Sequence, residues 1–491
     1  MAGVKSLFKD TAIYGVSSIV GRFLNWCLVP MYTYCFAAAE YGIVTNLYAY
    51  VALVLIILTY GMETGFFRFA NHEHWTNPAQ VYTTALMSLG CSSLLFIIAG
   101  CLLSPQIAEW LDCGEHPSYI WMMVIAVGVD AYTSIPFAYL RYKKRPVRFA
   151  SIKLLNIGLN IGLNLFFILL CPIIWAHSPQ WISWFYNPAF GVGYIFLANL
   201  ISSLVVLLMV LPEIVAEKYD FNGKLWREML KYSYPLLILG VAGIMNQTID
   251  KILYPMLIAD KDAAMTGLGI YGANYKIAIV MVMFIQAFRF AYEPFIFAQN
   301  REKGEDKTKA YSDAMTWFVI FGLFIFLGVM YFLPILKFFI SPNYFEGLRV
   351  VPIIMLAELF FGIFFNLSLW YKLTDRTIWG TWFSLFGLAV TLALNVAFVP
   401  MYGYMACAWA AFCCYGLMMV ASYVVGRVKH PIDYDVKRLM GYAVAAMALW
   451  GVSVVVAADN NWIDFPVRIV LLGVYFGIVY VAEFRMKKSL K

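Results

Sequence analysis

The stretch FIQAFRFAYEPF, residues 284–295, places an arginine and a glutamate inside a segment that is otherwise almost entirely apolar or aromatic. The apolar run around it covers residues 269–297, and as a helix it is long enough to cross about 30 Å of hydrocarbon. A charged side chain at the centre of a membrane helix costs roughly 2.5–3.5 kcal/mol on insertion scales, so such residues usually face a bundle interior or a water-filled cavity. The stretch therefore predicts a membrane span in which Arg289 needs a partner or a ligand.

The composition of the whole chain agrees with a membrane environment. Of its 491 residues, 63% are hydrophobic and 13% are charged, and the mean hydropathy is +0.75, whereas soluble globular proteins carry about 25% charged residues. The 9 cysteines lie mostly in apolar runs without CxxC or metal-ligand spacing, so we expect no disulfide framework and no metal site. The net charge of +7 is concentrated at the ends of apolar runs, which favours a topology signal over a nucleic-acid partner.

Apolar stretches of roughly 20 residues, each long enough for a membrane helix, recur along the whole sequence. The connections between them are too short for a soluble domain, so the pattern predicts an all-α polytopic membrane protein with about 14 transmembrane helices. The expected spans are 11–34, 43–67, 80–103, 119–140, 149–174, 189–211, 232–258, 269–297, 311–333, 350–370, 378–399, 402–426, 439–458 and 465–484.

The first expected span differs from a cleavable signal peptide. Lys5 and Lys9 precede it and three alanines follow it at 37–39, but its apolar region is too long and contains Arg22 near the middle. We expect this span to remain in the mature protein.

Lysine and arginine positions predict the orientation in the membrane. With a cytoplasmic N-terminus, the cytoplasmic connections hold 26 of the 35 cations, the opposite connections hold four, and five lie within spans. Because short loops rich in these residues stay on the cytoplasmic side, both termini are expected in the cytoplasm.

Two pairs of segments indicate an internal repeat. VSSIVGRFLNWCLVPM, residues 16–31, aligns with VAGIMNQTIDKILYPM, residues 241–256, and GLNIGLNLFFIL, residues 158–169, aligns with AVTLALNVAFVP, residues 389–400. The first span thus resembles the seventh, and the fifth resembles the eleventh.

This spacing of six spans predicts two six-helix lobes arranged as parallel repeats, as in several transporter folds. The second pair of segments superposes Asn164 on Asn395. The expected division is an N-terminal lobe at 1–215, a C-terminal lobe at 216–430, and two additional helices with a basic tail at 431–491.

Polar side chains lie near the middle of the two repeat-related spans. Ser18, Arg22 and Asn25 follow i, i+4, i+7 spacing, which places them on one face of a helix. Two such stripes at a lobe interface would line a central cavity. The seventh span carries Asn246, Gln247, Asp250 and Lys251 at the equivalent depth.

The eighth span adds two cations at different depths. Lys276 lies near its outer end, and Arg289 lies roughly 15 Å from the cytoplasmic loop at the helical rise. Gln286 and Glu293 share the side of the helix that carries Arg289, whereas Lys276 lies about 140° away from it. The two cations need not share a face.

Two interpretations of these cations stay open. In the first, Arg289 and Glu293, four residues apart, neutralise each other, and Arg22 finds an acid on another helix. In the second, the cations are partly unpaired and bind an anion, because guanidinium groups match phosphate oxygens in fork geometry. The candidate acids for Arg22 are Glu63, Asp130 and Glu358.

Four stretches of the chain resemble one family of transporters. They are KDTAIYGVSSIVGRFLNWCLVPMYTYCFAAAEYGIVT (9–45), GMETGFFRF (61–69), TIDKILYP (248–255) and YGANYKIAIVMVMFIQAFRFAYEPF (271–295). Over essentially its whole length the chain resembles the polysaccharide transporter family of the multidrug/oligosaccharidyl-lipid/polysaccharide exporter superfamily.

The resemblance implies a flippase of the bacterial inner membrane, which is not an enzyme. Its substrate would be undecaprenyl-pyrophosphate-linked oligosaccharide, moved from the cytoplasmic to the outer leaflet by alternating access. The product would feed O-antigen, capsule or exopolysaccharide assembly, with other assembly proteins as further partners.

In the related lipid II flippases, cations on the first, second and eighth helices hold the pyrophosphate. The resemblance carries this role to Arg22, Arg68 and Arg289, with Lys251 and Lys276 as further cations. The full set of implied substrate-binding residues is Arg22, Asn25, Arg68, Lys251, Lys276, Arg289 and Glu293.

Some of those relatives also place a sodium ion through acidic and amide groups on helices 7 and 11. The matching positions are Asn246, Asp250, Thr391 and Asn395, whose oxygens are suitable ligands for a hard cation, although the eleventh span offers no carboxylate. Coupling to Na⁺ or H⁺ and simple hydrogen bonding to a neighbouring helix both stay open. No other cofactor is expected.

Two other classes of protein compete with a flippase. Cation-coupled drug antiporters of the same superfamily usually carry a carboxylate in helix 1, whereas here the first span has none after Asp10. A membrane-embedded glycosyltransferase or polymerase would use the DxD motif within residues 432–438, or a metal at the HEH of residues 72–74. The aromatic loop at 175–188 would recognise sugars or anchor the chain at the membrane interface.

Overall fold

The computed structural model describes residues 20–71, 77–299, 306–374, 376, 378–456 and 461–485. Within these residues the chain is helical and has no β-strand, which confirms the all-α class. The chain divides into two compact units, unit 1 at residues 1–269 and unit 2 at residues 270–491.

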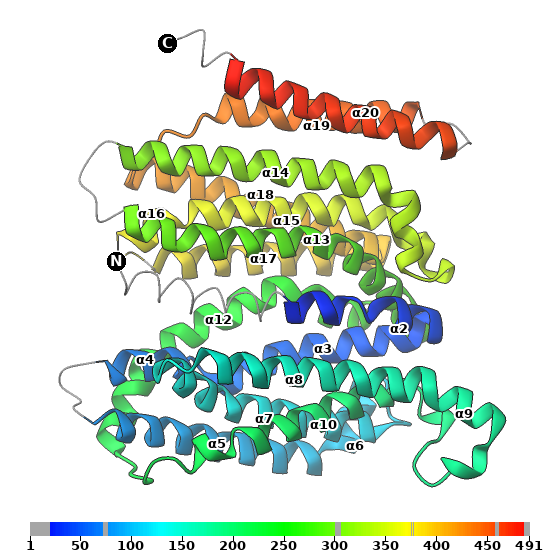
Figure 1. The fold of residues 1–491 in the computed structure, drawn as a ribbon, viewed down its shortest axis with the longest axis vertical. Helices are drawn as coiled ribbons and strands as arrows, with labels where there is room; N and C mark the ends of the chain where they lie inside the picture. The colour runs from blue at the N-terminus through cyan, green and yellow to red at the C-terminus, as the bar shows by residue number, and fades with distance from the viewer. Residues whose placement is uncertain are drawn as a thin grey trace. The chain divides into compact units, whose positions relative to one another are not determined.

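Unit 1 holds the helices from α2 to α12 and the start of α13 (Figure 1). Two 3₁₀ turns, at Pro179–Trp181 and Pro188–Phe190, follow α9. The helices are α2 Val29–Cys35, α3 Ala38–Thr59, α4 Met62–Ala70, α5 Pro78–Leu102, α6 Ser104–Trp110, α7 Pro117–Tyr142, α8 Pro146–Leu165 with a π turn at Phe166–Leu170, α9 Cys171–His177, α10 Gly193–Met209, α11 Leu211–Ile214, α12 Gly223–Leu257 and α13 Lys261–Gln299.

Unit 2 holds the rest of α13 and the helices that follow it (Figure 1). Short 3₁₀ segments at Lys337–Phe339 and Pro342–Arg349 join the first two of these helices, and a π turn at Val481–Arg485 follows the last. The helices are α14 Asp306–Leu336, α15 Val350–Leu367, α16 Leu369–Leu373, α17 Ile378–Tyr402, α18 Tyr404–Lys429, α19 Val436–Val455 and α20 Asn461–Tyr480.

The number of helices agrees with the expected membrane spans. In the described residues, 12 helical segments are long and apolar enough to cross a membrane. A shorter apolar helix at Gly193–Met209 and the helical residues 20–26 occupy the two remaining expected positions. The protein is therefore a multi-pass membrane protein with about 14 transmembrane helices, as the sequence predicts.

Proline and asparagine explain why several helices begin where they do. Pro78, Pro117 and Pro146 lie in the first turns of α5, α7 and α8, where the missing N–H leaves no hydrogen bond unmade. Asn77 and Asn222 cap α5 and α12 by accepting backbone N–H groups of the next turn. These local signals fix the helix starts independently of tertiary packing.

The second expected span is divided into two helices. The sequence predicts one uninterrupted span at 43–67, but α3 ends at Thr59 and α4 begins at Met62. Between them Tyr60 and Gly61 have φ values of 32° and 71°, in the left-handed region that ends helices.

In unit 1, two glycines allow α3 and α13 to cross closely. A Cβ at Gly42 would lie 2.0 Å from the carbonyl oxygen of Met265, and a Cβ at Gly269 would lie 1.8 Å from that of Ala38. Small residues at helix crossings let backbones approach in this way within membranes. The crossing therefore depends on the absence of side chains at both positions.

In unit 2, aromatic side chains of α15 to α18 form a buried cluster. It contains Phe364, Trp370, Tyr371, Phe383 and Tyr415. Such rings supply large apolar contact areas and pack in offset or edge-to-face pairs. The cluster holds the helices that carry the candidate polar residues of this unit.

The two helices outside the predicted repeat, α19 and α20, pack against α14 (Figure 1). Arg468 on α20 donates to the carbonyl oxygen of Tyr331 on α14 at 2.9 Å, and the Tyr475 hydroxyl donates to that of Ile320 at 3.1 Å. Because hydrogen bonds satisfy polar groups that lipid cannot, α19 and α20 are attached to unit 2 by polar as well as apolar contacts.

The two asparagines that the predicted repeat superposes have similar surroundings. Asn164 and Asn395 are each fully buried, and each donates to the carbonyl four residues earlier, that of Asn160 at 2.7 Å and that of Thr391 at 2.8 Å. The prolines of the other matched pair differ, because Pro30 lies in the first turn of α2 whereas Pro255 lies inside α12. The lobe boundaries stay predictions.

Candidate functional site

Arg22 and Asn25 lie on the helical residues 20–26 at the start of the described chain, and both are exposed. Among the residues that the structure describes, no carboxylate lies within ion-pair distance of Arg22. Ser18, the third member of the expected stripe, lies outside the described residues. Within the described residues, no carboxylate therefore neutralises Arg22.

Two of the acids considered as partners of Arg22 lie in unit 1, near other cations. Glu63 on α4 forms an ion pair with Arg141 at the end of α7. Asp130 lies near Lys153 of α8, whose ammonium also sits 4.1 Å from the centroid of the Phe137 ring. These acids are thus compensated within unit 1 without Arg22.

Arg68 projects from α4 and is exposed. Its guanidinium carbon lies 4.2 Å from the centroid of the Tyr232 ring on α12, which is a cation–π distance. The contact fixes the position of the guanidinium and leaves its charge uncompensated by any carboxylate in the described residues.

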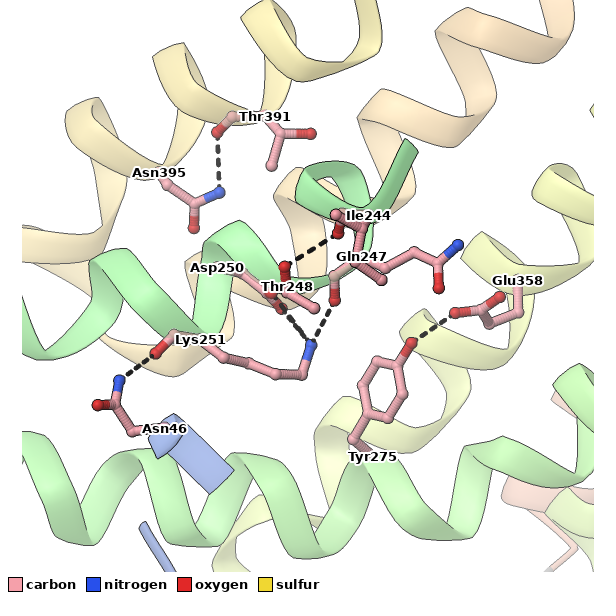
Figure 2. Close-up of polar contacts among 10 residues, drawn as sticks. All are labelled: Asn46, Ile244, Gln247, Thr248, Asp250, Lys251, Tyr275, Glu358, Thr391 and Asn395. Atoms are coloured by element: carbon pink, nitrogen blue, oxygen red, sulfur yellow. Dashed lines mark hydrogen bonds and ion pairs between the residues drawn. The ribbon is translucent and has the colours of Figure 1, made fainter. Parts of the chain in front are cut away.

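On α12 the predicted polar group forms a compact network (Figure 2). The ammonium of Lys251 contacts both carboxylate oxygens of Asp250 at 3.0 Å, and it donates to the carbonyl oxygen of Gln247 at 3.0 Å. The side chain of Lys251 is only 13% exposed and that of Asp250 only 9%. Asn46 on α3 donates to the Lys251 carbonyl at 2.9 Å. The ion pair is therefore buried and locally neutral.

Asn246 lies one turn earlier on the same helix and is buried. Its amide donates to the carbonyl of Ala242 at 2.9 Å. Thr248 likewise donates to the carbonyl of Ile244 at 2.9 Å (Figure 2). Back-bonding of this kind satisfies a polar side chain within its own helix.

In unit 2, two cations share one aromatic ring. The guanidinium carbon of Arg289 on α13 lies 3.6 Å from the centroid of Phe365 on α15, and the ammonium of Lys372 on α16 lies 4.0 Å from the same centroid. Arg289 is one of the predicted site residues, whereas Lys372 is not and lies just beyond the expected span at 350–370. The side chain of Glu293 lies outside the description of the structure.

A signal for Lys372 exists in the sequence, although it is weak. The residue follows the apolar run of the tenth span within the stretch LWYKL, residues 369–373. A lysine just after an apolar run usually indicates which side of the membrane the loop lies on, so this position alone does not indicate a binding site. Only the fold shows that Lys372 and Arg289, which are far apart in the chain, contact the same ring.

Lys276 lies one residue after Tyr275 on α13 and is half-buried. The hydroxyl of Tyr275 donates to the carboxylate of Glu358 on α15 at 2.6 Å (Figure 2). Glu358 is 5% exposed, so this bond supplies a buried carboxylate with a donor from a neighbouring helix. The tyrosine has no counterpart among the predicted site residues.

On α17, Thr391 and Asn395 are buried, with exposed fractions of 3% and 0%. The Asn395 amide donates to the Thr391 carbonyl (Figure 2). The side-chain oxygens Thr391 Oγ1 and Asn395 Oδ1 have no hydrogen-bond partner among the described residues. Two buried acceptor oxygens therefore remain available on one face of α17.

Neither of the two motifs that could indicate an enzyme, DxD and HEH, forms a recognisable catalytic or metal site in the described residues. In the DxD motif, Asp435 accepts the backbone N–H of Arg438 at 3.1 Å and caps α19. The HEH at 72–74 lies outside the described residues. Within the described residues no group of three or more His, Cys, Asp or Glu side chains has the arrangement of a metal site.

The aromatic loop at 175–188 includes the end of α9 and the 3₁₀ turn Pro179–Trp181. Trp181 and Trp184 are 79% and 82% exposed. Both rings therefore point away from the protein core, as either an interfacial anchor or a sugar contact requires.

Comparisons with known proteins show the family of the chain. The family model described as "Polysaccharide biosynthesis protein" matches residues 7–297, which is more than half of the sequence. The chain belongs to this family. The expected family is thereby confirmed. No curated protein sequence matches the chain.

Solved structures show which fold the family member adopts. The lipid II flippase MurJ in an inward closed conformation is similar with a TM-score of 0.72 at 13% identity, over 96% of this chain and 99% of that one. An inward-facing multidrug resistance MATE family transporter of the MOP superfamily is similar with a TM-score of 0.67 at 12% identity, over 83% and 94%. The MATE multidrug transporter DinF-BH gives 0.61 at 14%, over 86% and 96%. The polysaccharide biosynthesis family member thus has a fold shared by membrane transporters.

Proposed function

We propose that this protein is a flippase for undecaprenyl-pyrophosphate-linked oligosaccharide. It moves the substrate from the cytoplasmic to the outer leaflet of a bacterial inner membrane by alternating access, with both of its termini in the cytoplasm. Membership of the polysaccharide biosynthesis family and similarity in fold to a lipid II flippase support this proposal. The translocated units serve O-antigen, capsule or exopolysaccharide assembly.

The observation that carries the proposal is the pair of cations on the Phe365 ring. A guanidinium stacked on an aromatic face is held in a defined plane, and its planar fork of N–H groups matches the geometry of phosphate oxygens. Arg289 and Lys372 together place two positive charges within 4.0 Å of one ring centroid. Two adjacent cations suit a pyrophosphate better than a neutral or cationic drug.

An apolar cavity in unit 2 offers space for a lipid chain. It has a volume of about 500 Å³ and lies between α14, α15, α18 and α19, where aliphatic and aromatic side chains line it. An isoprenoid chain can move from the hydrocarbon of the bilayer into such a lining without exposing apolar surface to water. In this proposal the cavity receives part of the undecaprenyl chain while the pyrophosphate stays at the cations.

Translocation requires no covalent step in this mechanism. Arg22, Arg289 and Lys372 bind the pyrophosphate, because carrying it through an apolar passage would leave its charges unsolvated at a high free-energy cost. Rocking of two halves around a fixed site, as in other repeat transporters, exposes the substrate first to one leaflet and then to the other.

The fit of a coupling cation to the residues present is incomplete. Thr391 Oγ1 and Asn395 Oδ1 are buried acceptor oxygens, which suit a hard cation, but both are neutral. In unit 1 the Asp250 carboxylate is already compensated by Lys251. We therefore propose coupling to Na⁺ or H⁺ as an optional feature of transport. The transport cycle described above does not require a bound ion.

The second candidate function is cation-coupled drug export, favoured by the similarity in fold to the MATE transporters. A drug antiporter binds cationic or neutral compounds, for which a pair of cations on one ring is unfavourable. A membrane-embedded glycosyltransferase or polymerase is disfavoured, because Asp435 of its DxD motif serves as a helix cap.

The test is inter-leaflet transfer in proteoliposomes that contain a fluorescent undecaprenyl-pyrophosphate oligosaccharide. We compare wild type with Arg22→Ala and Arg289→Ala, after thermal unfolding has shown that each variant is folded. Lys429→Ala, at the exposed end of α18, is the matched control for loss of one cation.

We expect transfer by wild type and Lys429→Ala, and loss of transfer in the other two variants. Equal transfer by all four proteins would show that Arg22 and Arg289 have a structural role and do not bind the substrate. If wild type transfers no lipid but exports a cationic dye, the protein is a drug antiporter.

A further inference from the structure

Unit 1 contains two adjoining pockets that share the side chains of Phe221 and Trp226. The deeper pocket has a volume of about 840 Å³ and lies between α3, α5 and α12. The second has a volume of about 640 Å³ and lies at the N-terminal end of α12. Both volumes are in the range of about 300–1,000 Å³ that is usual for ligand sites.

The deeper pocket is chemically suited to a hydrocarbon chain. The side chains of Ile57, Leu95, Leu230 and Leu237 contribute aliphatic surface to its lining. Most of its polar groups already have partners: Ser88 Oγ accepts the indole N–H of Trp226 at 2.8 Å and lies 2.6 Å from the Tyr60 hydroxyl. Two further serines of the lining, Ser92 and Ser233, donate to backbone carbonyls. What remains for a ligand is therefore mainly apolar surface.

The second pocket is polar and carries positive charge. The exposed Lys224 and Arg227 line it together with the half-buried Gln80 and Asn222. The carboxylate of Asp220, in the same loop, accepts the Gln80 amide N–H at 2.6 Å. That acid is thus held by Gln80.

The polar pocket is held in shape by hydrogen bonds between the loop and α5. Thr83 Oγ1 donates to the Asp220 carbonyl at 3.1 Å, and Thr84 Oγ1 accepts the Asn222 N–H at 3.3 Å. Asn222 in turn caps α12 through the backbone N–H groups of Lys224 and Leu225. Because these bonds fix the loop before a ligand arrives, little ordering entropy is lost on binding.

We infer that these two pockets form one binding site for an anionic glycerophospholipid of the surrounding membrane. The phosphate contacts Lys224 and Arg227, and one acyl chain enters the deeper pocket past Phe221 and Trp226. Aromatic rings favour the boundary between headgroups and hydrocarbon, and basic residues beside it attract anionic headgroups. This site lies on other residues than the proposed pyrophosphate site, and the inference does not depend on the proposed function.

The test is native mass spectrometry of the full chain released from nanodiscs of phosphatidylcholine and phosphatidylglycerol. Wild type is compared with Lys224→Ala/Arg227→Ala and with the pocket-filling variant Cys91→Trp, because Cys91 lines the deeper pocket. The matched control is Arg427→Ala/Lys429→Ala, an exposed basic pair at the end of α18. Thermal unfolding of each variant shows that it is folded.

We expect wild type and the control pair to retain phosphatidylglycerol in preference to phosphatidylcholine. Loss of each cation of the site should lower retention about fivefold, the effect expected for one basic residue near an anionic surface. Cys91→Trp should lower retention of both lipids. The inference is overturned if the Lys224/Arg227 pair and the control behave alike, or if Cys91→Trp retains as much lipid as wild type.

Two competition arms distinguish other sources of the same anion chemistry. Inorganic pyrophosphate in excess should leave phosphatidylglycerol bound, since the acyl chain contributes to affinity. Displacement by inorganic pyrophosphate would show a free-anion site, and displacement by undecaprenyl pyrophosphate at equal concentration would show a substrate site. Either result would contradict a resident phospholipid.

Discussion

At the scale of single residues, four cations on the long apolar helical segments fall into two groups. Lys251 and Arg141 contact carboxylates of Asp250 and Glu63, and these contacts neutralise them locally. Arg68 and Arg289 lie over aromatic rings, which orient a guanidinium. We propose this second group as substrate-binding residues because the rings fix the direction of both guanidinium groups.

Replacing Arg289 tests whether its planar fork matters for binding. Arg289→Ala should weaken binding of the lipid-linked pyrophosphate by about 1.5–3 kcal/mol, roughly ten- to a hundredfold, the usual size of a hydrogen bond to a charged group. Arg289→Lys should lie between wild type and Ala, because it keeps the charge and loses bidentate geometry. Fluorescence titration in nanodiscs measures both affinities. Equal affinities for Lys and Ala would exclude a role for the charge.

Replacing Lys372 tests whether the second cation on the Phe365 ring also contributes to transport. Lys372→Ala should lower the transport rate and leave the unfolding temperature near that of wild type, because a cation–π contact of a half-buried lysine contributes only about 1 kcal/mol to stability. The proteoliposome transfer assay and thermal unfolding give the two readouts. A variant with unchanged transfer and a lower unfolding temperature would make Lys372 a packing residue.

The Asp250–Lys251 pair predicts a stability effect with a rescue. Asp250→Asn leaves a buried ammonium without its carboxylate, and breaking a buried pair from one side costs about 3–5 kcal/mol. Asp250→Asn/Lys251→Met should recover most of the loss, because it removes the unpaired charge. The comparison is made by denaturant unfolding in detergent. A double variant as unstable as the single one would show that Asp250 has another role.

At the scale of helices, the crossing of α3 and α13 decides how unit 1 is assembled. Gly42 and Gly269 each face a backbone carbonyl of the other helix at a distance that no Cβ tolerates. The sequence contains many glycines, and nothing in it distinguishes Gly42 and Gly269 from the others. Only the packing of the helices shows that these two lie at a close crossing. Gly158 on α8, for example, has open space where a Cβ would stand.

Gly42→Ala should therefore destabilise the protein by about 1–3 kcal/mol, the usual effect of overpacking. Gly158→Ala is the control and should be neutral or stabilising by up to about 1 kcal/mol, because alanine is the better helix former. Unfolding temperatures in the same detergent measure both effects. Similar changes for the two variants would show that the close crossing does not form.

The division of the second span into α3 and α4 shows a limit of helix prediction. Apolar length predicts a single span at 43–67, and Tyr60 is not a residue type that signals a break. A left-handed tyrosine is uncommon and is held here by its bond to Ser88 on α5. The break could not be predicted because a contact with another helix stabilises it.

At the scale of the whole molecule, the distribution of cations predicts the topology. A green fluorescent protein fused to the C-terminus should be fluorescent, and alkaline phosphatase fused there should be inactive, because both report a cytoplasmic end. Fusions in the 175–188 loop should give the opposite pair of results. A C-terminus with active phosphatase would reverse the orientation and the direction of transport proposed above.

The sequence by itself determined the membrane environment, the all-α class, about 14 helices and the family, and it located the cations within the spans. These properties follow from the length, hydropathy and spacing of neighbouring residues, which local physics controls. Only the tertiary structure decided which partner each charge has: Arg141 for Glu63, and one Phe365 ring for both Arg289 and Lys372. Such pairings depend on which helix faces meet, and hydrophobic periodicity says that a face is buried without saying against which neighbour.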